Sequence, residues 1–463
     1  MAQPAFPYNL SGHYCRYRVM NAKTLAQTQI DAAQALASDG QPSLHICLLG
    51  YRSHPFVGGQ GIYLHYLSKA LLALGHQVDV ISGPPYPEVI DGVKLIKLPS
   101  LDLFAVEDPT RALKLKHLTS YTDTFEWCSK LTGGFAEPYT FGRRVAKYLK
   151  RHGHQYDIVH DNQCLAWGLL DIQKRGLPVV ATVHHPITRD LEIKLAAEDN
   201  WGMRLLIKRW HYFLKMQKRV VQKLNHIVTV SEQSRQDIAQ AFERPVASIN
   251  LMHNGIDTEV FKPNPAINKQ AYKIISTASA DQPLKGLRFL LQAIANLKTH
   301  YPEITLTVIG KLHAGGDTEK LLQKLALEKH VNFISGITTA ELVDQYNSAQ
   351  VAVVPSLYEG FGLPAGEAMA CALPLVATDG GAIPEVVGDA ALSVPAGDAM
   401  AITQALSQLF DKPALRQMLS EKARRRIEEN FSWHKVATEL TTYYRNILTP
   451  AAAAQKVRRH AHR

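Results

Sequence analysis

The chain has 463 residues of ordinary globular composition, 46% hydrophobic and 20% charged, and this length exceeds what one hydrophobic core usually serves. Its five cysteines are scattered and never form a Cys-x-x-Cys pair, which argues against a disulfide framework or a zinc site and is typical of a reducing cytosol. The formal net charge of +10 indicates attraction to anions, but charge alone does not choose among a nucleotide, a nucleic acid and an acidic membrane surface.

The predicted elements begin after a polar leader, residues 1–42. The stretch from Met1 to Arg18 carries no apolar core of signal-peptide length, and nowhere in the chain do about 18 apolar residues follow one another. We therefore expect a cytoplasmic protein that spans no membrane, either free or peripheral on the inner face of the membrane.

Residues 43–255 alternate short buried strands with helical segments and are predicted to form a first Rossmann-like domain. Ser43–Gly50 has the composition of a buried strand. From Ile62 to Leu74 the apolar residues fall three and four positions apart, as in an amphipathic helix, with Gly75 at the C-cap position. Strand, loop and helix then recur, which predicts a doubly wound parallel sheet. Further strands are predicted at Val78–Ser82, Asp157–His160, Pro178–His184 and His226–Ser231.

Within this domain, residues 204–223 interleave apolar and basic side chains. The stretch is either an amphipathic basic helix that lies on anionic lipid, or an ordinary helix that packs its apolar face on the sheet and leaves its lysines in solvent. The sequence leaves both interpretations open, and with them a peripheral contact with an anionic membrane.

Residues 256–430 repeat the alternation more regularly and are predicted to form a second Rossmann-like domain. The turn-rich His253–Asp257 and the proline-broken Phe261–Pro265 mark a hinge before it. A final helical stretch, residues 431–448, is long enough to return to the first domain, and residues 449–463 are predicted to be a disordered basic tail. The strands of this domain are predicted at Lys273–Ala278, Ile304–Gly310, Val331–Ser335, Val351–Pro355 and Leu375–Thr378.

The segment that carries most chemical information, Ser356–Ala370, directly follows a predicted buried strand. Gly360 and Gly362 allow a sharp backbone turn, and Pro364 suits the first position of a helix because its missing N–H has no partner there. The expected result is a helix N-terminus with free amides, which binds phosphate without a metal.

Two glutamates flank this turn. Glu359 is placed to accept hydrogen bonds from sugar hydroxyls, and Glu367, one turn into the helix, from ribose hydroxyls. Glycines at strand-to-helix turns and acids in a first helical turn are common in α/β proteins, so one glycine with one acid would carry little weight. Two glutamates on either side of Gly-Phe-Gly-Leu-Pro are much harder to explain as structural features alone.

This segment resembles the Glu-x7-Glu motif of family 4 glycosyltransferases, enzymes of the GT-B fold, with Glu359 and Glu367 as the two acids. The resemblance implies an α/β protein in which two Rossmann-like, doubly wound parallel-sheet domains face a cleft and the C-terminal helix crosses back to the first domain. It covers roughly residues 44–447. The other motifs that resemble the family, in the right order, are Thr229–Glu232, His253–Asp257, Lys285–Gly286, Val308–Gly310, Asp379–Glu385 and Phe431–Trp433.

In that family the second domain holds a nucleotide sugar, and the resemblance implies which residues of this sequence contact it. Lys285 is implied to contact the diphosphate and Glu367 the ribose, while Gly310 belongs to the same donor-binding set. The sugar is implied to contact Glu359 and the turn that follows it. The residues of that turn are Gly360, Phe361, Gly362 and Leu363.

The first domain is implied to contribute two further groups. Gly58 and Gly59 open a Gly-Gly-Gln-Gly sequence that resembles the glycine loop of the family, whose backbone approaches the donor; it lacks the Gly-x-Gly-x-x-Gly spacing of dinucleotide binders. His184 matches a family histidine that contacts the donor sugar from the acceptor side, and His185 lies beside it. The implied catalytic residues are His184, Lys285 and Glu359.

The sequence departs from the family pattern near the lysine. Family members usually carry an arginine about five residues before it, whereas residues 276–284 contain none. The diphosphate is then held either by Lys285 together with the Ser279 hydroxyl, or with an arginine from elsewhere in the chain.

The resemblance implies transfer of a sugar, with retention at the anomeric carbon, from a nucleoside-diphosphate sugar (UDP- or GDP-linked) to a hydroxyl of a glycan, a lipid or a small molecule. The departing diphosphate develops negative charge, which a cation and oriented amides stabilise. The cleft segments contain no Asp-x-Asp motif, so no metal cofactor is expected. The alternative is a non-catalytic nucleotide-sugar-binding protein of the same fold. Nucleic-acid binding is not expected, because no reader motif is present.

Overall fold

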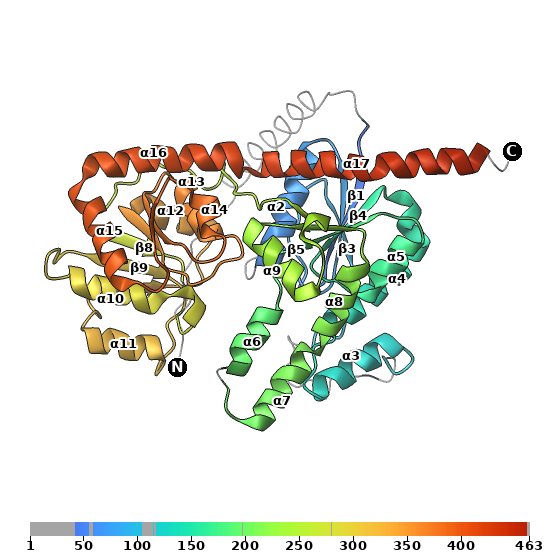
Figure 1. Cartoon of the computed structure of the whole chain (residues 1–463), viewed down its shortest axis with the longest axis horizontal. Coiled ribbons are helices and arrows are strands. Elements are labelled where there is room, and N and C mark those ends of the chain that lie inside the picture. Colours follow the sequence, from blue (N-terminus) through green and yellow to red (C-terminus); the bar gives the residue numbers. More distant parts are fainter. Residues whose placement is uncertain are drawn as a thin grey trace, which may run out of the picture.

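A computed structural model describes residues 42–54, 59–103, 114, 117–196, 198–278 and 280–460 of the chain. Two α/β domains lie side by side, and two consecutive long helices run along both of them (Figure 1). The first domain contains a seven-stranded sheet and the second a six-stranded sheet, and all strand pairs in both are parallel.

The sheet of the first domain has the strand order β3-β2-β1-β4-β5-β6-β7. Its central strands are buried along their whole length, as expected for a parallel sheet covered by helices on both faces. The strands are β1 (His45–Gly50), β2 (Gln77–Ser82), β3 (Lys94–Lys97), β4 (Ile158–Asn162), β5 (Val179–Val183), β6 (His226–Thr229) and β7 (Ile249–Leu251). The helices are α2 (Gly59–Ala73), α3 (Tyr121–Leu131), α4 (Glu137–His152), α5 (Trp167–Lys174), α6 (Thr188–Ala196), α7 (Trp201–Trp210), α8 (Leu214–Lys223) and α9 (Glu232–Phe242).

The sheet of the second domain has the order β10-β9-β8-β11-β12-β13. Its strands are β8 (Lys273–Ser276), β9 (Thr305–Ile309), β10 (Val331–Ile334), β11 (Val351–Val354), β12 (Leu375–Thr378) and β13 (Leu392–Val394). Its helices are α10 (Leu287–Leu297), α11 (Asp317–Leu325), α12 (Thr339–Ser348), α13 (Leu363–Ala370), α14 (Ile383–Val387), α15 (Ala399–Asp411) and α16 (Pro413–Asn430). The doubly wound architecture predicted from the sequence is confirmed in both halves.

Three strands were not predicted from the sequence: β3, β7 and β13. Each is only three or four residues long and lies at an edge of its sheet. An edge strand pairs on one side and is partly exposed, so it lacks the continuous apolar run that reveals a central parallel strand.

The last helix, α17 (Trp433–His460), returns from the second domain to the first. Val436, Leu440 and Tyr444 are buried in the core of the first domain, against residues of β1, α2 and β2. The sequence predicts a disordered tail at residues 449–463, but α17 continues past Leu448 as far as His460. The segment is helical because it contains a run of alanines, and alanine has the highest helix propensity.

The basic stretch, residues 204–223, is divided between two helices with opposite surroundings. α8 buries Leu214 and Val220 against the first domain. α7 has no buried residue and leaves Leu205 54% and Leu206 50% exposed; together with α6 it projects from the domain (Figure 1). Neither interpretation of the sequence therefore holds for the whole stretch, since α8 is a packed helix and α7 is an exposed one.

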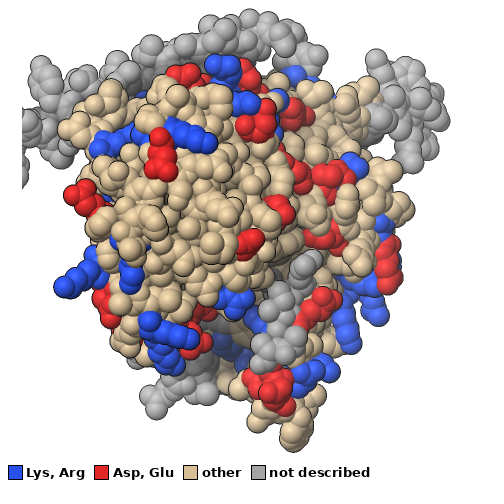
Figure 2. All heavy atoms as spheres, turned by 60° about the vertical axis from the view of Figure 1, so that its left-hand side comes forward, with Lys and Arg blue, Asp and Glu red and all other residues tan. Residues whose placement is uncertain are grey.

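Charged side chains are dispersed on the face shown in Figure 2, where Lys and Arg are interrupted by Asp, Glu and uncharged surface. The excess positive charge of the chain therefore does not gather into one continuous band on this face. Within the described ranges, no helix combines the length and the apolar character that crossing a membrane requires.

Candidate functional site

A cavity of ≈ 390 Å³ lies between the two domains. Each sheet reverses its strand order beside it, between β1 and β4 in the first domain and between β8 and β11 in the second. Open α/β sheets bind ligands beyond the carboxyl ends of their strands at such points. The lining comes from α2, from the residues after β4 and β5, from hinge residues 254–257, from the turn 359–364, and from Lys285, Glu367 and Trp433.

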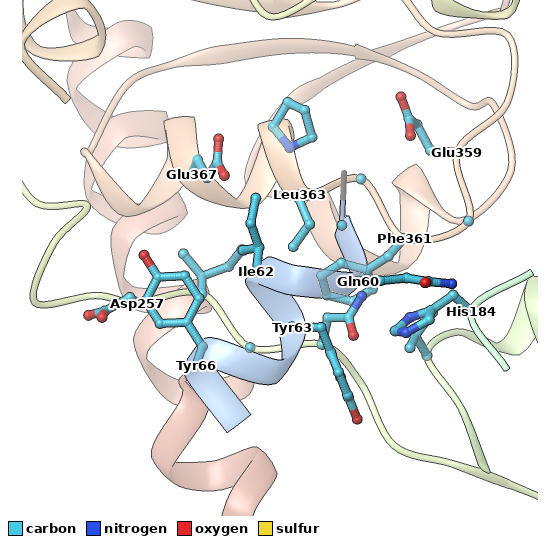
Figure 3. A pocket seen from close by; sticks show the side chains of 18 of the residues that line it. Gln60, Ile62, Tyr63, Tyr66, His184, Asp257, Glu359, Phe361, Leu363 and Glu367 are labelled. Atoms are coloured by element: carbon cyan, nitrogen blue, oxygen red, sulfur yellow. The ribbon is translucent and has the colours of Figure 1, made fainter. Parts of the chain in front are cut away.

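The two glutamates predicted from the sequence lie at different ends of this cavity. In Figure 3, Glu359 and His184 lie towards one side and Glu367, Tyr66 and Asp257 towards the other, with Ile62 and Leu363 between them. That Glu359 and Glu367 contact different parts of one extended ligand stays a prediction.

The turn that leads into α13 exposes backbone amides to the cavity. Gly362 is the N-cap residue of α13 with φ +96, a left-handed conformation that favours glycine, and proline follows within the first helical turn. Among the described residues, the amides of Phe361, Gly362 and Leu363 have no hydrogen-bond partner. Free N–H groups at the positive end of a helix are a common arrangement for binding an anion.

Lys285 and Glu359 are hydrogen-bonded to each other beside this turn. Lys285 Nζ donates to Glu359 Oε1 at 2.8 Å, and Ser356 Oγ donates to the same oxygen at 2.8 Å. Gly286 has φ +65, and a Cβ there would lie 1.9 Å from the carbonyl oxygen of Pro355, so only glycine allows the lysine segment to lie against the end of β11. The lysine is thus held beside Glu359 in the cavity wall.

Glu367 is a partly buried carboxyl whose pKa lies close to physiological pH. Burial raises its pKa to about 7, and a hydrogen bond from Tyr346 Oη to Glu367 Oε2, 3.1 Å long, opposes that rise. A carboxylate in such a place gains from hydroxyl donors, because they replace the water that burial removed.

His184 enters the cavity from the end of β5. Its Nε2 lies 2.7 Å from Asn162 Oδ1, and its backbone amide donates to Gln163 Oε1 at 2.7 Å. The ring of Tyr63 packs edge-on at 4.8 Å between centroids. Burial, with smaller contributions from His185 and His160, lowers the pKa of His184 to about 3, so the imidazole is neutral at physiological pH.

The N-terminus of α9 in the first domain holds the turn of the second domain. Ser231 Oγ donates to the carbonyl oxygen of Gly360 at 2.7 Å. Ser234 Oγ lies 3.1 Å from the same carbonyl and 3.0 Å from the carbonyl oxygen of His184. One hydroxyl therefore bridges the histidine segment of the first domain and the glycine turn of the second.

A carboxylate of the second domain caps the same helix. Glu385 accepts hydrogen bonds from the backbone amides of Glu232 at 2.7 Å and of Gln233 at 2.9 Å. Tyr358 Oη donates to Asp237 Oδ2 on α9 at 2.5 Å. These contacts join α9 of the first domain to the second domain.

The structure brings most of the predicted site residues to this cavity. The residues found in its lining are Gly59, His184, His185, Lys285, Glu359, Gly360, Phe361, Gly362, Leu363 and Glu367. Gly58 lies outside the described residues, as does Ser279. Gly310 follows β9, donates its amide to Ile334 and is not part of the described lining. No arginine lines the cavity in the described part of the chain, so a second cation from elsewhere is not found there.

Several lining residues were not predicted as site residues. Asp257 accepts a hydrogen bond from Lys69 Nζ of α2 at 2.9 Å, and Trp433 packs on Gly255, where a Cβ would lie 2.4 Å from the indole. Asn254 is buried in the lining, and its Oδ1 has no partner within the described ranges. Tyr66 belongs to the apolar stripe of α2, and helical spacing does not distinguish a ligand contact from a core contact.

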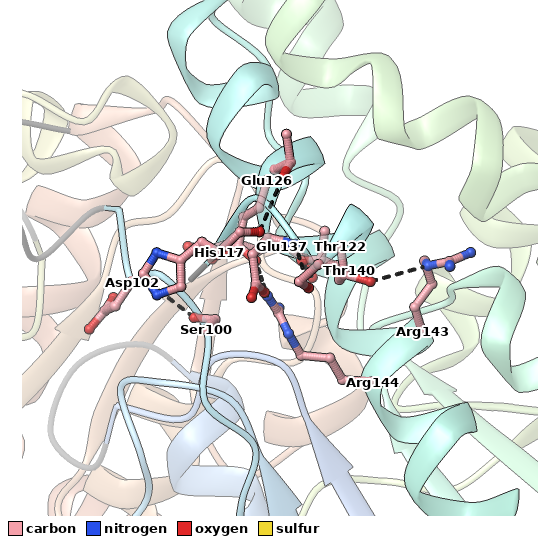
Figure 4. A network of polar contacts seen from close by, with 12 residues as sticks. Ser100, Asp102, His117, Thr122, Glu126, Glu137, Thr140, Arg143 and Arg144 are labelled. Atoms are coloured by element: carbon pink, nitrogen blue, oxygen red, sulfur yellow. Dashed lines mark hydrogen bonds and ion pairs between the residues drawn. The ribbon is translucent and has the colours of Figure 1, made fainter. Parts of the chain in front are cut away.

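A separate polar network lies at α3 and α4 (Figure 4), and Arg52 of the loop after β1 pairs with Glu137 of α4. Arg52 Nη1 lies 3.0 Å and 3.1 Å from the two carboxylate oxygens of Glu137. Arg144 Nη2 lies 2.7 Å from Glu126 Oε2 and 2.6 Å from Asp123 Oδ1. Burial raises the pKa of Glu137 to about 7, while Arg52 opposes that rise. We assign this network a structural role in fixing the helices.

In the described part of the chain, no three His, Cys, Asp or Glu side chains come together as a metal site would require. Lys285 and the turn with the free amides both line the cavity.

Two family models match the chain. The model described as "Glycosyltransferase Family 4" matches residues 57–260, and the model described as "Glycosyl transferases group 1" matches residues 257–426. The boundary between the two matches falls at the hinge predicted from the sequence.

Comparison with known proteins gives relatives over most of the chain. The MMP alpha-(1->4)-mannosyltransferase of Mycolicibacterium hassiacum is 43% identical over 414 residues, which are 89% of this chain and 100% of that protein. Among solved structures, the sucrose-phosphate synthase of Thermosynechococcus elongatus superposes with a TM-score of 0.64 at 23% identity, covering 88% of this chain and 100% of that one. Anabaena Alr3699/HepE, solved in complex with UDP and glucose, gives 0.62 at 14% identity, covering 87% and 100%.

Proposed function

The chain belongs to glycosyltransferase family 4, has the GT-B fold and is a glycosyltransferase, and from this we propose that it transfers a mannosyl group from a nucleoside-diphosphate mannose to a hydroxyl acceptor, with retention and without a metal. The observation that carries the proposal is the turn at α13, where free amides and Lys285 meet one end of a cavity whose other end holds Glu367. This arrangement suits a diphosphate between a sugar and a ribose. A non-catalytic role for the same fold is not supported, because the 43% identical relative is a mannosyltransferase.

The choice of mannose rests on that relative, whose name gives an α-(1→4) mannosyl linkage. The choice of a nucleotide rests on the phosphate-binding chemistry of the turn, and a structural neighbour that has been solved with UDP and glucose supports it. An α-linked product formed from an α-linked donor requires retention at the anomeric carbon.

We propose that the donor phosphate itself accepts the proton of the attacking hydroxyl. The bond from the anomeric carbon to the phosphate oxygen breaks, the bond to the acceptor oxygen forms on the same face, and the acceptor proton passes to the leaving phosphate. Lys285 and the amides of Phe361 to Leu363 stabilise the developing negative charge. The contacts between α9 and the turn exclude water, which would otherwise hydrolyse the donor.

The test is a titration of the purified protein with GDP, UDP and ADP, followed by their mannose and glucose derivatives. We expect one nucleotide to bind, its mannose derivative to be consumed when an oligomannoside is added, and activity to persist after dialysis against EDTA. Binding of none of the three nucleotides would contradict the donor class, and loss of turnover with EDTA would contradict metal independence. A product with inverted anomeric configuration would contradict retention.

We further propose that α7 rests on an anionic membrane surface. Trp201 is 77% exposed, and Leu205 and Leu206 are each at least half exposed. Between residues 201 and 223 the sequence has seven Lys or Arg residues and no Asp or Glu. Exposed apolar side chains flanked by cations suit the surface of an anionic bilayer, because the apolar side chains insert among the acyl chains and the cations face the negatively charged headgroups.

This proposal predicts binding to vesicles. The protein is expected to sediment with vesicles of phosphatidylglycerol and phosphatidylcholine, less so at high salt and not with phosphatidylcholine alone. The double variant Trp201→Ala, Leu205→Ala should lose binding by at least about tenfold, because it removes the inserted side chains. The matched control is Met400→Ala, Met418→Ala, which removes exposed apolar side chains of the second domain. Equal loss in both variants, or no vesicle binding by the unaltered protein, would contradict the proposal.

A further inference from the structure

The orientation of one buried amide determines the protonation of the cavity histidine. Asn162 ends β4 and is 1% exposed. Its Nδ2 donates to the backbone carbonyl oxygen of Gln60 at 2.9 Å, and its Oδ1 lies 2.7 Å from His184 Nε2. A carbonyl oxygen only accepts, so the nitrogen of the amide must face Gln60 and the oxygen must face His184.

The histidine tautomer follows from this orientation. Oδ1 only accepts hydrogen bonds, so His184 Nε2 must carry the proton, and a neutral imidazole then has an unprotonated Nδ1. We infer that Asn162 is a positioning residue that fixes His184 as the Nε2–H tautomer, so that Nδ1 is a hydrogen-bond acceptor for a hydroxyl of the donor sugar. This rests on the proposed function, in which His184 contacts that sugar.

The surroundings of His184 leave Nδ1 available for a ligand. No described residue forms a hydrogen bond with Nδ1. Gln163 fixes the backbone on both sides of the ring: its Oε1 accepts from the His184 amide at 2.7 Å, and its Nε2 donates to the carbonyl oxygen of His185 at 2.8 Å. The edge-on ring of Tyr63 restricts rotation of the imidazole. The Nδ1 atom of His184 is thus held in one orientation, in which it can only accept a hydrogen bond.

Protonation does not interfere with that role. Besides His185 and His160, Tyr63 on α2 packs on His184 among the described residues, and Lys285 and Glu359 line the cavity with it. Lys285 and Glu359 are paired with each other, so neither presents an uncompensated charge to the imidazole. His184 therefore acts as an acceptor and not as a general acid, and a donor sugar that lacks the matching hydroxyl should react about tenfold to a hundredfold more slowly.

The tautomer can be observed directly by NMR of protein labelled with ¹⁵N in its histidine rings, with the His184 signals identified by their loss in His184→Gln. We expect the Nε2–H pattern for His184 in the unaltered protein and in Asn162→Asp, which keeps the acceptor oxygen. In Asn162→Leu, which removes the acceptor, we expect the proton to be shared with Nδ1. A proton on Nδ1 in the unaltered protein would overturn the inference, and this measurement needs no donor and no folded variant of Asn162.

Kinetics separate this inference from the proposed function. Asn162→Leu should lower kcat/KM for the sugar donor about tenfold while the Kd of the free nucleotide stays unchanged, and Asn162→Asp should restore part of the loss. Unchanged kcat/KM in Asn162→Leu would overturn the positioning role. If the NMR shows Nε2–H but no nucleotide binds, the proposed function fails and the assignment of the tautomer is upheld. If a nucleotide binds but the proton lies on Nδ1, the assignment of the tautomer fails and the proposed function is upheld.

Discussion

Lys285→Ala is expected to lower turnover of the sugar donor by about 10² to 10³-fold, the usual result of removing one group that stabilises transition-state charge. In the described part of the chain Lys285 is the only cation that lines the cavity, so no neighbour replaces it. Its removal also leaves Glu359 with Ser356 as its hydrogen-bond donor, and an unneutralised carboxylate then repels the diphosphate. The measurement is kcat and KM with the donor identified by nucleotide titration.

The matched control for this variant is Lys324→Ala, which removes an exposed lysine from α11 of the same domain. It changes the net charge equally and should leave kcat unaltered. Lys285→Arg keeps the charge but not the shape of the ammonium group, so partial activity is expected. Turnover of Lys285→Ala within threefold of the unaltered protein would remove Lys285 from the catalytic machinery.

Glu367 is expected to make nucleotide affinity depend on pH. Its pKa is about 7 in the ligand-free protein, and ribose hydroxyls donate to the carboxylate, so binding favours the deprotonated form. The affinity should therefore be full above pH 8 and fall by up to about tenfold for each unit below pH 7. Glu367→Ala should weaken binding about tenfold to a hundredfold at pH 8, as for loss of a charged hydrogen bond.

Glu367→Gln separates this effect from folding. Glutamine keeps an oxygen that accepts from Tyr346 but does not titrate, so its nucleotide affinity should vary less with pH than that of the unaltered protein. The raised pKa means that the folded state disfavours the ionised carboxyl, so the stability that this group contributes falls as pH rises from 4.5 towards 7, and the variant should melt no lower than the unaltered protein at pH 8. Glu303→Gln, an exposed change in the same domain, is the control. Identical pH profiles for both variants and the unaltered protein would exclude Glu367 from the site.

The sequence by itself determined the two doubly wound domains and the turn between β11 and α13. Buried parallel strands are continuous apolar runs, and the turn depends on residues close in sequence, so local spacing is enough to find them. The same holds for the two glutamates, because only seven residues of chain separate Glu359 from Glu367.

Only the tertiary structure decided which distant groups meet. The pairing of Lys285 with Glu359, the bridge from Ser234 to Gly360, and the amide of Asn162 that orients His184 join residues from different elements or different domains. The exposure of α7 and the burial of α8 were likewise not distinguishable by composition, since both interleave apolar and basic residues. The physical reason is the same in each case: burial and hydrogen-bond pairing depend on which surfaces pack together, and local periodicity carries no information about the partner surface.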